Sequence, residues 1–194
     1  MRARGLPYVV SLLLSAGAHG AAAQALTPLP LRRGEIAVHV RVRHFPDFTA
    51  RVTADSASFT GDSLADVRAV ALAPAAKIHT GIGLLDGRMR HTLDAAHYPE
   101  IRFELLRVTP GAAHGDTTAV TLNGRFTIRG QTRDDTIPGA VVVSPGSLVA
   151  TATFPLDIRD YGIAPPTAFF GFVRAEPVVT IRVRLEFGTR GRAR

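Results

Sequence analysis

Cysteine, tryptophan and lysine are nearly absent from this sequence of 194 residues. The lack of any cysteine excludes a disulfide scaffold, a thiolate zinc site, a catalytic thiol and a lipidated N-terminal cysteine. With no tryptophan and three tyrosines, the chain also lacks the aromatic girdles that an outer-membrane barrel needs at both interfaces. Lys77 is the single lysine, so the formal charge of +7 rests on arginine and does not by itself indicate a nucleic-acid partner.

Long apolar runs are lacking as well. A bilayer span needs roughly 20 apolar residues, and the apolar stretch 6–18 is shorter than that. It follows Arg2 and Arg4 and precedes three alanines that end at Ala23, which is the pattern of a secretory signal peptide. We therefore predict a signal peptide over 1–23, cleavage near Ala23, and a mature protein that is periplasmic or secreted.

The positive charge is concentrated at the two ends of the chain. Two arginines leave with the signal, and 182–194 holds five arginines against Glu186. The remaining segment, 25–181, carries 16 basic and 15 acidic residues, which is not the charge pattern of a nucleic-acid-binding surface. We expect no nucleic-acid partner, and we assign 188–194 as a basic tail, a candidate for transient contact with an anionic membrane surface.

Apolar and polar residues alternate through most of the chain after a short lead at 24–33. Such alternation is typical of half-buried antiparallel strands, because parallel strands covered on both faces are continuously apolar. The alternating segments are 35–43, 48–53, 100–105, 120–129, 148–156 and 179–187. Clusters of glycine, proline and aspartate predict turns at 110–111, 130–135, 138–139 and 145–146.

These segments predict one all-β domain over 34–187, with about eight strands in an antiparallel barrel or a two-sheet sandwich. One segment departs from the period of two. Over 84–97, Leu85, Met89 and Leu93 recur at helical spacing, and Pro99 follows as a stop. The prediction is thus a series of strands with one short helical insert. Its inward faces combine large rings with small residues, which fits either a tapering apolar cavity or an ordinary packed core.

Three stretches of the sequence carry a recognisable pattern. The first contains Thr80, Gly81, Asp86, Met89, Tyr98, Pro99, Ile101 and Phe103. The second contains Gly124, Thr127, Ile128, Arg129, Gly130 and Thr132. The third contains Asp160, Tyr161, Gly162, Ile163, Pro165, Pro166, Thr167 and Gly171. In this order and at this spacing, they resemble the YceI-like family of exported bacterial proteins.

The resemblance implies an antiparallel lipocalin-like barrel whose internal tunnel holds, in some relatives, a polyisoprenoid or another amphiphilic chain. It favours a cavity over a packed core. It implies a non-catalytic protein that sequesters or carries an amphiphilic lipid, either a polyisoprenoid or an isoprenoid quinone, with no required cofactor. The alternative is a ligand-free structural or stress-related interaction module with a packed core. Leu85 stands where the family usually has arginine and Arg88 where it has histidine, so head-group recognition is expected to differ here.

Aromatic residues on the inward faces and two arginines are the predicted ligand-binding residues. They are Phe103, Phe126, Ile128, Phe154, Phe169, Phe170, Phe172, Arg88 and Arg90. The rings within 169–172 follow two prolines where no strand pattern holds, so they either plug one end of the barrel as core or line its entrance. The two arginines are placed to meet an anionic or polar head group at the mouth of the barrel.

Neither catalysis nor metal binding is expected. His91 and His97 are six positions apart, a spacing that puts them on neither one helix face nor one strand face. Asp94 lies three positions after His91, and a solvated ion pair explains that spacing. No serine lies in a Gly-x-Ser-x-Gly elbow, and no phosphate-cradling glycine loop opens a helix. We therefore expect no enzyme activity, no catalytic residue and no metal site.

Overall fold

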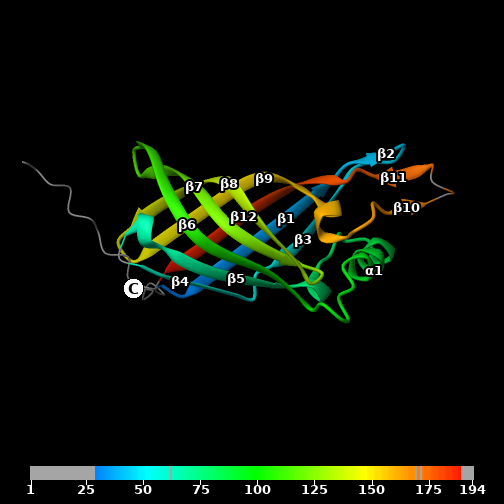
Figure 1. The fold of residues 1–194 in the computed structure, drawn as a ribbon, viewed down its shortest axis with the longest axis horizontal. Coiled ribbons are helices and arrows are strands. Elements are labelled where there is room, and N and C mark those ends of the chain that lie inside the picture. Colours follow the sequence, from blue (N-terminus) through cyan, green and yellow to red (C-terminus); the bar gives the residue numbers. More distant parts are fainter. Residues whose placement is uncertain (1–28, 62, 169, 171, 189–194) are drawn as a thin grey trace, which may run out of the picture.

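A long antiparallel sheet curls around itself to form the body of the molecule (Figure 1). The computed structural model describes residues 29–188 except 62, 169 and 171. The strands of this sheet, in spatial order, are β3 (Phe48–Thr53), β1 (Leu31–Val40), β12 (Val178–Gly188), β9 (Ser147–Asp157), β8 (Gln131–Ser144), β7 (Thr117–Ile128), β6 (Glu100–His114), β5 (Arg68–Pro74) and β4 (Ser56–Thr60).

The two ends of this strand order are joined by the chain itself. β3 pairs with β1 at one edge, and β4 pairs with β5 at the other. Only Ala54 and Asp55 separate β3 from β4 along the chain. The Ala54 N–H donates to the Gly34 carbonyl at 3.0 Å, and the Asp55 N–H donates to the Leu72 carbonyl at 3.0 Å. This segment therefore bridges both edges and closes a barrel. With β3 and β4 counted as one strand, the nine strands become eight, which confirms the predicted all-β barrel.

One end of the barrel is filled by its own side chains, and we call it the packed end. The buried cluster there consists of Phe59, Val67, Leu105, Val108, Val120, Val141, Leu148 and Phe187. The rings of Phe59 and Phe187 meet edge to face, with their centroids 5.2 Å apart. Leu64, in the short 3-10 helix η1 (Leu64–Asp66), packs against the same cluster. None of these eight side chains lines the interior cavity described below.

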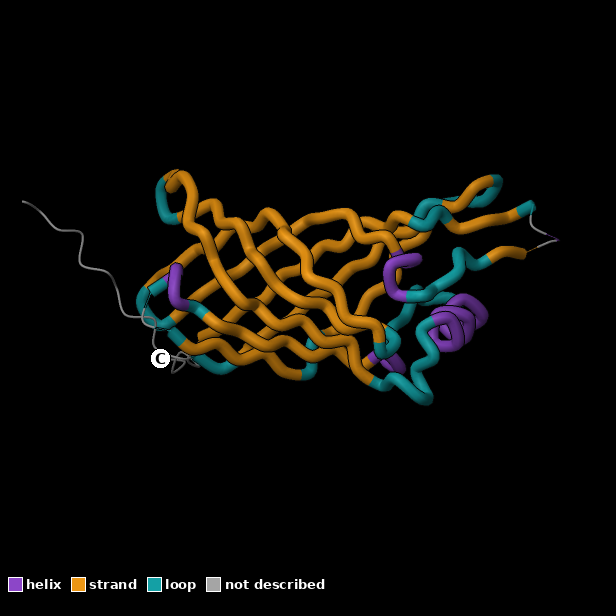
Figure 2. The backbone as a smooth tube through the Cα atoms, viewed as in Figure 1, coloured by secondary structure: helices purple, strands orange, loops and turns teal. Residues whose placement is uncertain are grey.

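The opposite end carries the remaining elements, and we call it the open end (Figures 1 and 2). The helix α1 (Gly83–Thr92) lies there, as do the 3-10 helices η2 (Ala75–Lys77) and η3 (Ile158–Tyr161). A small second sheet extends beyond the barrel, in the order β10 (Thr167–Ala168), β11 (Val173–Ala175) and β2 (Val42–Arg43). None of the helices in the described residues is long and apolar enough to cross a membrane.

Two of the predicted turns, at 110–111 and 138–139, are wrong because they lie inside long strands, and most of a third, 130–135, belongs to β8. Pro110 pairs with Val120 in β6, and the register shifts between Pro110 and Ala113, a bulge that accommodates the missing N–H of proline. Pro138 likewise pairs with Thr121 inside β8. The turn between β6 and β7 instead contains Gly115, whose φ of 63° is left-handed.

Other boundaries also differ from the sequence prediction. α1 ends at Thr92 rather than at 97, because Asp94 takes a left-handed φ of 50° that cannot continue a helix. β4, β5, β10 and β11 were not predicted, since they are short or lack clear alternation. β8 was not predicted either, because its aspartates, proline and glycine were interpreted as turns. Gly188, which was assigned to the basic tail, is instead the last residue of β12 and pairs with Ser147 of β9. The predicted signal peptide and 189–194 lie outside the described residues.

Candidate functional site

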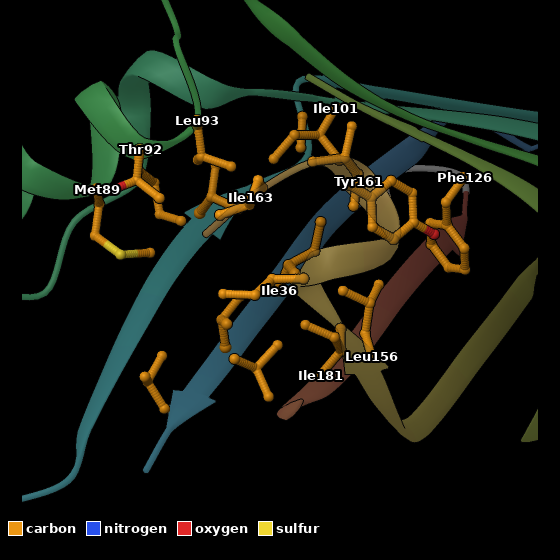
Figure 3. Close-up of a pocket in the computed structure, with 18 of the residues that line it drawn as sticks. Ile36, Met89, Thr92, Leu93, Ile101, Phe126, Leu156, Tyr161, Ile163 and Ile181 are labelled. Carbon is orange, nitrogen blue, oxygen red and sulfur yellow. The ribbon is translucent and has the colours of Figure 1, made fainter. Parts of the chain in front are cut away.

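A cavity of about 580 Å³ occupies the barrel interior between the packed end and α1 (Figure 3). Its walls are the inward-facing residues of the alternating strands. They include Ile36 and Val38 of β1, Ala152, Phe154 and Leu156 of β9, and Val179, Ile181 and Val183 of β12. The alternation therefore places one apolar stripe of each strand toward the same space, and that space is not filled by the chain.

The floor of the cavity is the layer where the packed end begins. Phe103, Leu122, Ala150 and Leu185 line the cavity, and the same four side chains pack against the buried cluster of the packed end. A ligand chain inside the barrel can therefore extend from the open end to this layer and no further. The cavity is a blind tunnel with its mouth beside α1.

α1 forms one side of the mouth. Leu84, Leu85, Met89 and Leu93 turn toward the cavity, as Figure 3 shows for Met89 and Leu93. This face was only indirectly indicated by the helical spacing of three of these residues, and none of the four was among the predicted binding residues. Phe48 and Ile163 also line the cavity and were not among the predicted binding residues.

The start of α1 is fixed by Asp86. Its Oδ1 accepts a hydrogen bond from the Thr80 N–H at 2.6 Å and another from the Thr80 hydroxyl at 2.7 Å. These bonds favour the carboxylate and hold the pKa of Asp86 below its ordinary value of 3.8. Asp86 is therefore ionised at neutral pH and ties the helix to the segment that precedes it.

Polar side chains in the lining are few. They are Arg88, Thr92, Thr151, Tyr161, Thr167 and Glu176. Glu176 is engaged by Arg41 and Arg43, whose Nε atoms lie 3.4 and 3.9 Å from its carboxylate oxygens. Arg88 makes no ion pair among the described residues. The arrangement offers an apolar tunnel whose lining includes one arginine, the exposed Arg88 on α1.

Tyr161 lies on η3 where the cavity wall meets the open end. It is 3% exposed, and burial raises the pKa of Tyr161 to about 12. The phenol is therefore neutral across the physiological range and can donate a hydrogen bond but not carry charge. Its ring contributes another apolar surface to the wall (Figure 3).

The three patterned stretches of the sequence meet at the open end. Tyr98, from the first stretch, lies against Gly130 of the second, and a Cβ on that glycine would be 2.5 Å from the ring. Arg129, beside Gly130 in the turn between β7 and β8, donates to the Gly162 carbonyl of the third stretch at 2.6 Å. These residues thus brace the rim of the barrel rather than touch the cavity centre.

Five of the predicted binding residues line the cavity: Phe103, Phe126, Ile128, Phe154 and Arg88. The rings of Phe126 and Phe103 have centroids 4.6 Å apart, and Phe126 and Phe154 are 5.5 Å apart. Arg90 is not in the lining. Phe170 and Phe172 are 112% and 64% exposed, so neither is buried core. Phe169 lies outside the described residues.

The histidines of the α1 segment are arranged differently from the prediction. Asp94 pairs with His97, whose Nδ1 lies 2.7 Å from Asp94 Oδ1, and not with His91 as the three-residue spacing indicated. The helix has already ended at Asp94, so helical spacing no longer decides which side chains meet. The hydrogen bond from His97 holds the pKa of Asp94 below its ordinary value. The described residues contain no cluster of three side chains suited to a metal ion.

The fold and the cavity together define a lipocalin-type antiparallel barrel with an apolar, blind interior. The family model of the YceI-like domain matches residues 32–187, and the chain belongs to this family. That match agrees with the resemblance found in the sequence and lies close to the predicted domain of 34–187. A search of curated proteins finds no match.

Solved structures with the same fold share little sequence with this chain. BcnA of Burkholderia cenocepacia is 16% identical, with a TM-score of 0.64, over 79% of this chain and 95% of that one. A polyisoprenoid binding domain from Saccharophagus degradans, implicated in plant cell wall breakdown, is 15% identical, with a TM-score of 0.62, over 82% and 97%. The Campylobacter jejuni YCEI protein is 14% identical, with a TM-score of 0.55, over 72% and 85%.

Proposed function

We propose that this protein binds one amphiphilic isoprenoid lipid, a polyisoprenoid or an isoprenoid quinone, and carries or sequesters it in the periplasm without chemical change. The observation that carries the proposal is the blind apolar cavity of about 580 Å³. Pockets for single small-molecule ligands usually measure about 300–1,000 Å³. An interior of this size argues against the packed module that was the alternative.

The orientation of the ligand follows from the lining. The floor at Leu122 and Leu185 is apolar and therefore receives the end of the hydrocarbon chain. Arg88, on the wall formed by α1, would lie beside a polar or anionic head group at the mouth. The Saccharophagus degradans relative is described as polyisoprenoid binding, which supports the same class of ligand for this chain.

The direct test is the lipid content of the purified mature protein. Protein prepared without detergent is examined by native mass spectrometry and by solvent extraction, and apo protein is titrated with a fluorescent polyprenol and with an isoprenoid quinone. We expect about one lipid for each chain and saturable uptake of at least one probe. Absence of both a co-purified lipid and any probe uptake would refute the proposal.

A cavity-filling substitution links uptake to this space. Ala152 lines the cavity on β9, so Ala152→Phe places a ring where the ligand chain would lie. We expect uptake to fall at least about tenfold while thermal stability is kept, because the ring enters empty space rather than a packed core. The matched control is Ala119→Phe, an exposed position on β7. Equal uptake by both variants would place the ligand elsewhere.

A further inference from the structure

Most of the exposed large apolar side chains lie at the open end. Of the eight that are exposed in the described part of the chain, all but Leu106 lie at this end. Tyr98 lies just before β6 and Val178 at the start of β12, and the other five are Phe45, Ile82, Leu84, Phe170 and Phe172. They come from the loop between β2 and β3, the N-terminal part of α1, and the loop between β10 and β11. Concentrated exposure of this kind marks an interaction surface, whereas isolated exposed side chains do not. We call these five residues the apolar tip.

The two loops of the apolar tip are fastened to each other. The His44 ring stacks on the Phe172 ring with centroids 4.6 Å apart and planes 19° apart. His44 Nδ1 also lies 3.0 Å from the Phe172 carbonyl oxygen. These contacts join segments 128 positions apart in the sequence, at the far end of the small sheet (Figure 1). The exposed ring of Phe172 is therefore held in place by the neighbouring loop.

The apolar tip is continuous with the cavity. Phe45 and Leu84 are 52% and 73% exposed, and both also line the cavity. An apolar path therefore runs from the outer surface, past α1, to the blind interior. A lipid moving between a bilayer and the barrel along this path would leave little of its chain in water, which lowers the cost of transfer.

The charges beside the apolar tip are mainly positive. Arg43 and Arg174 face each other across β2 and β11, and Arg41 directly precedes β2. Glu176 forms ion pairs with both Arg41 and Arg43, so one carboxylate faces two guanidinium groups. Arg174 makes no ion pair among the described residues. Exposed rings beside arginines suit a membrane surface that carries anionic phospholipid.

We propose that the apolar tip docks the open end onto an anionic phospholipid bilayer, so that the ligand passes directly between membrane and cavity. Phe170 and Phe172 insert at the level of the head groups, and the arginines of the small sheet meet the phosphates. The exchange step rests on the proposed lipid carriage, whereas the docking itself does not. This places membrane contact at the open end, whereas the described part of β12 ends at the packed end, where Phe187 belongs to the buried cluster.

The experiment is flotation of the mature protein with two kinds of vesicle. One kind contains phosphatidylethanolamine with phosphatidylglycerol, and the other contains phosphatidylcholine alone. We expect binding to the anionic vesicles, weaker binding to the neutral ones, and a loss of about tenfold or more for the double variant Phe170→Ser with Phe172→Ser. Arg174→Glu is expected to weaken binding to the anionic vesicles alone.

Leu106→Ser is the matched control, since Leu106 is an exposed apolar residue on β6, in the wall of the barrel. It is expected to bind vesicles like the unmodified protein, as is a variant that lacks 189–194. Unchanged vesicle binding by the double variant, or binding lost only when 189–194 are removed, would overturn the proposal. No vesicle binding by the unmodified protein would overturn it too, and would leave the apolar tip to a protein partner.

A second readout separates docking from carriage. Uptake of a polyprenol probe is measured from vesicles as a rate and from dilute detergent as an equilibrium. If docking serves exchange, the double variant slows the first at least about fivefold and leaves the second unchanged. Loss of both would show damage to the cavity and overturn the assignment of these rings to docking. Vesicle binding without any probe uptake would refute lipid carriage while supporting the docking surface.

Discussion

The packed end and the open end are built from the same strands, yet one is filled and the other is hollow. β9 contributes Leu148 to the buried cluster at the packed end and Ala150 and Ala152 to the cavity. β12 similarly contributes Phe187 to the cluster and Val183 to the cavity wall. A regular alternation therefore determines which side chains face inward. Whether the interior is filled depends on the sizes of the side chains that meet across the barrel.

What covers each end also differs. At the packed end, Phe59 and Phe187 fill the cross-section of the barrel, and Leu64 of η1 packs against them. At the open end the cover is α1, which is not hydrogen-bonded into the sheet and is fixed at its start by the bonds between Asp86 and Thr80. Buried side chains also surround the cavity, so the two ends differ in the space left between their side chains. We therefore expect a lost ring to cost more stability at the packed end, and ligand access to be at the open end.

The largest expected effect comes from truncating a ring at the packed end. Phe187→Ala should lower the free energy of unfolding by about 3–5 kcal/mol, because Phe187 is surrounded by buried neighbours and its removal leaves a new void. Phe126→Ala, in the cavity wall, should cost no more than about half of that, because one side of the ring already faces empty space.

Urea unfolding of both variants, followed by circular dichroism, measures the difference between the two ends. Lipid uptake by Phe126→Ala should persist, since the substitution enlarges the cavity instead of blocking it. Equal losses of stability for the two variants would mean that the open end is as well packed as the other. The distinction between a stabilising end and a binding end would then fail.

The inward faces of the alternating strands could be predicted from the sequence because a period of two reports directly on strand geometry. The choice of a barrel over a sandwich came from the resemblance to the YceI-like family. Ile101, Phe103 and Ile128 lie where the alternation put them, and two of the three are among the predicted binding residues. The turn at Gly146 was also predicted correctly, and its φ of 72° explains why glycine stands there. Local pattern and global fold agree in these segments.

The apolar tip and the ends of α1 could not be predicted in the same way. Phe170 and Phe172 follow two prolines, and nothing in their spacing distinguishes exposed rings from a buried plug. Their exposure depends on β10 and β11, strands of two and three residues that pair only in the folded chain. The partner of Asp94 was mispredicted for a related reason, since the left-handed turn after α1 brings His97 to it.

A medium effect is expected from glycine substitutions in the turns at the two ends. Gly130→Ala should lower the free energy of unfolding by about 1–3 kcal/mol, because its φ of 71° is left-handed and a Cβ there would press on Tyr98. Gly115→Ala, in the β6–β7 turn at the other end, should cost only about 1–2 kcal/mol. Its φ of 63° is also left-handed, but a Cβ there meets nothing within 4 Å.

Thermal unfolding of the two alanine variants isolates the contact between Tyr98 and Gly130. The double variant Tyr98→Ala with Gly130→Ala should be destabilised by less than the sum of the two single variants, because the contact is removed once. Strict additivity would show that Tyr98 does not press on this turn. The bracing of the rim by the patterned stretches would then be reduced to the bond from Arg129 to Gly162.

The smallest effect concerns the attachment of α1 and depends on pH. The pKa of Asp86 is lowered by its hydrogen bonds from Thr80, so its stabilising contribution is present above the ordinary value of 3.8 and is lost as the pH falls through the lowered pKa. Asp86→Asn should therefore unfold slightly more easily than the unmodified protein at about pH 7, and the difference should vanish in acid.

Asp116→Asn, in the turn at the packed end, is the matched control. Chemical denaturation at both pH values measures this, and a difference for Asp86→Asn that persists in acid would show that shape rather than charge holds α1.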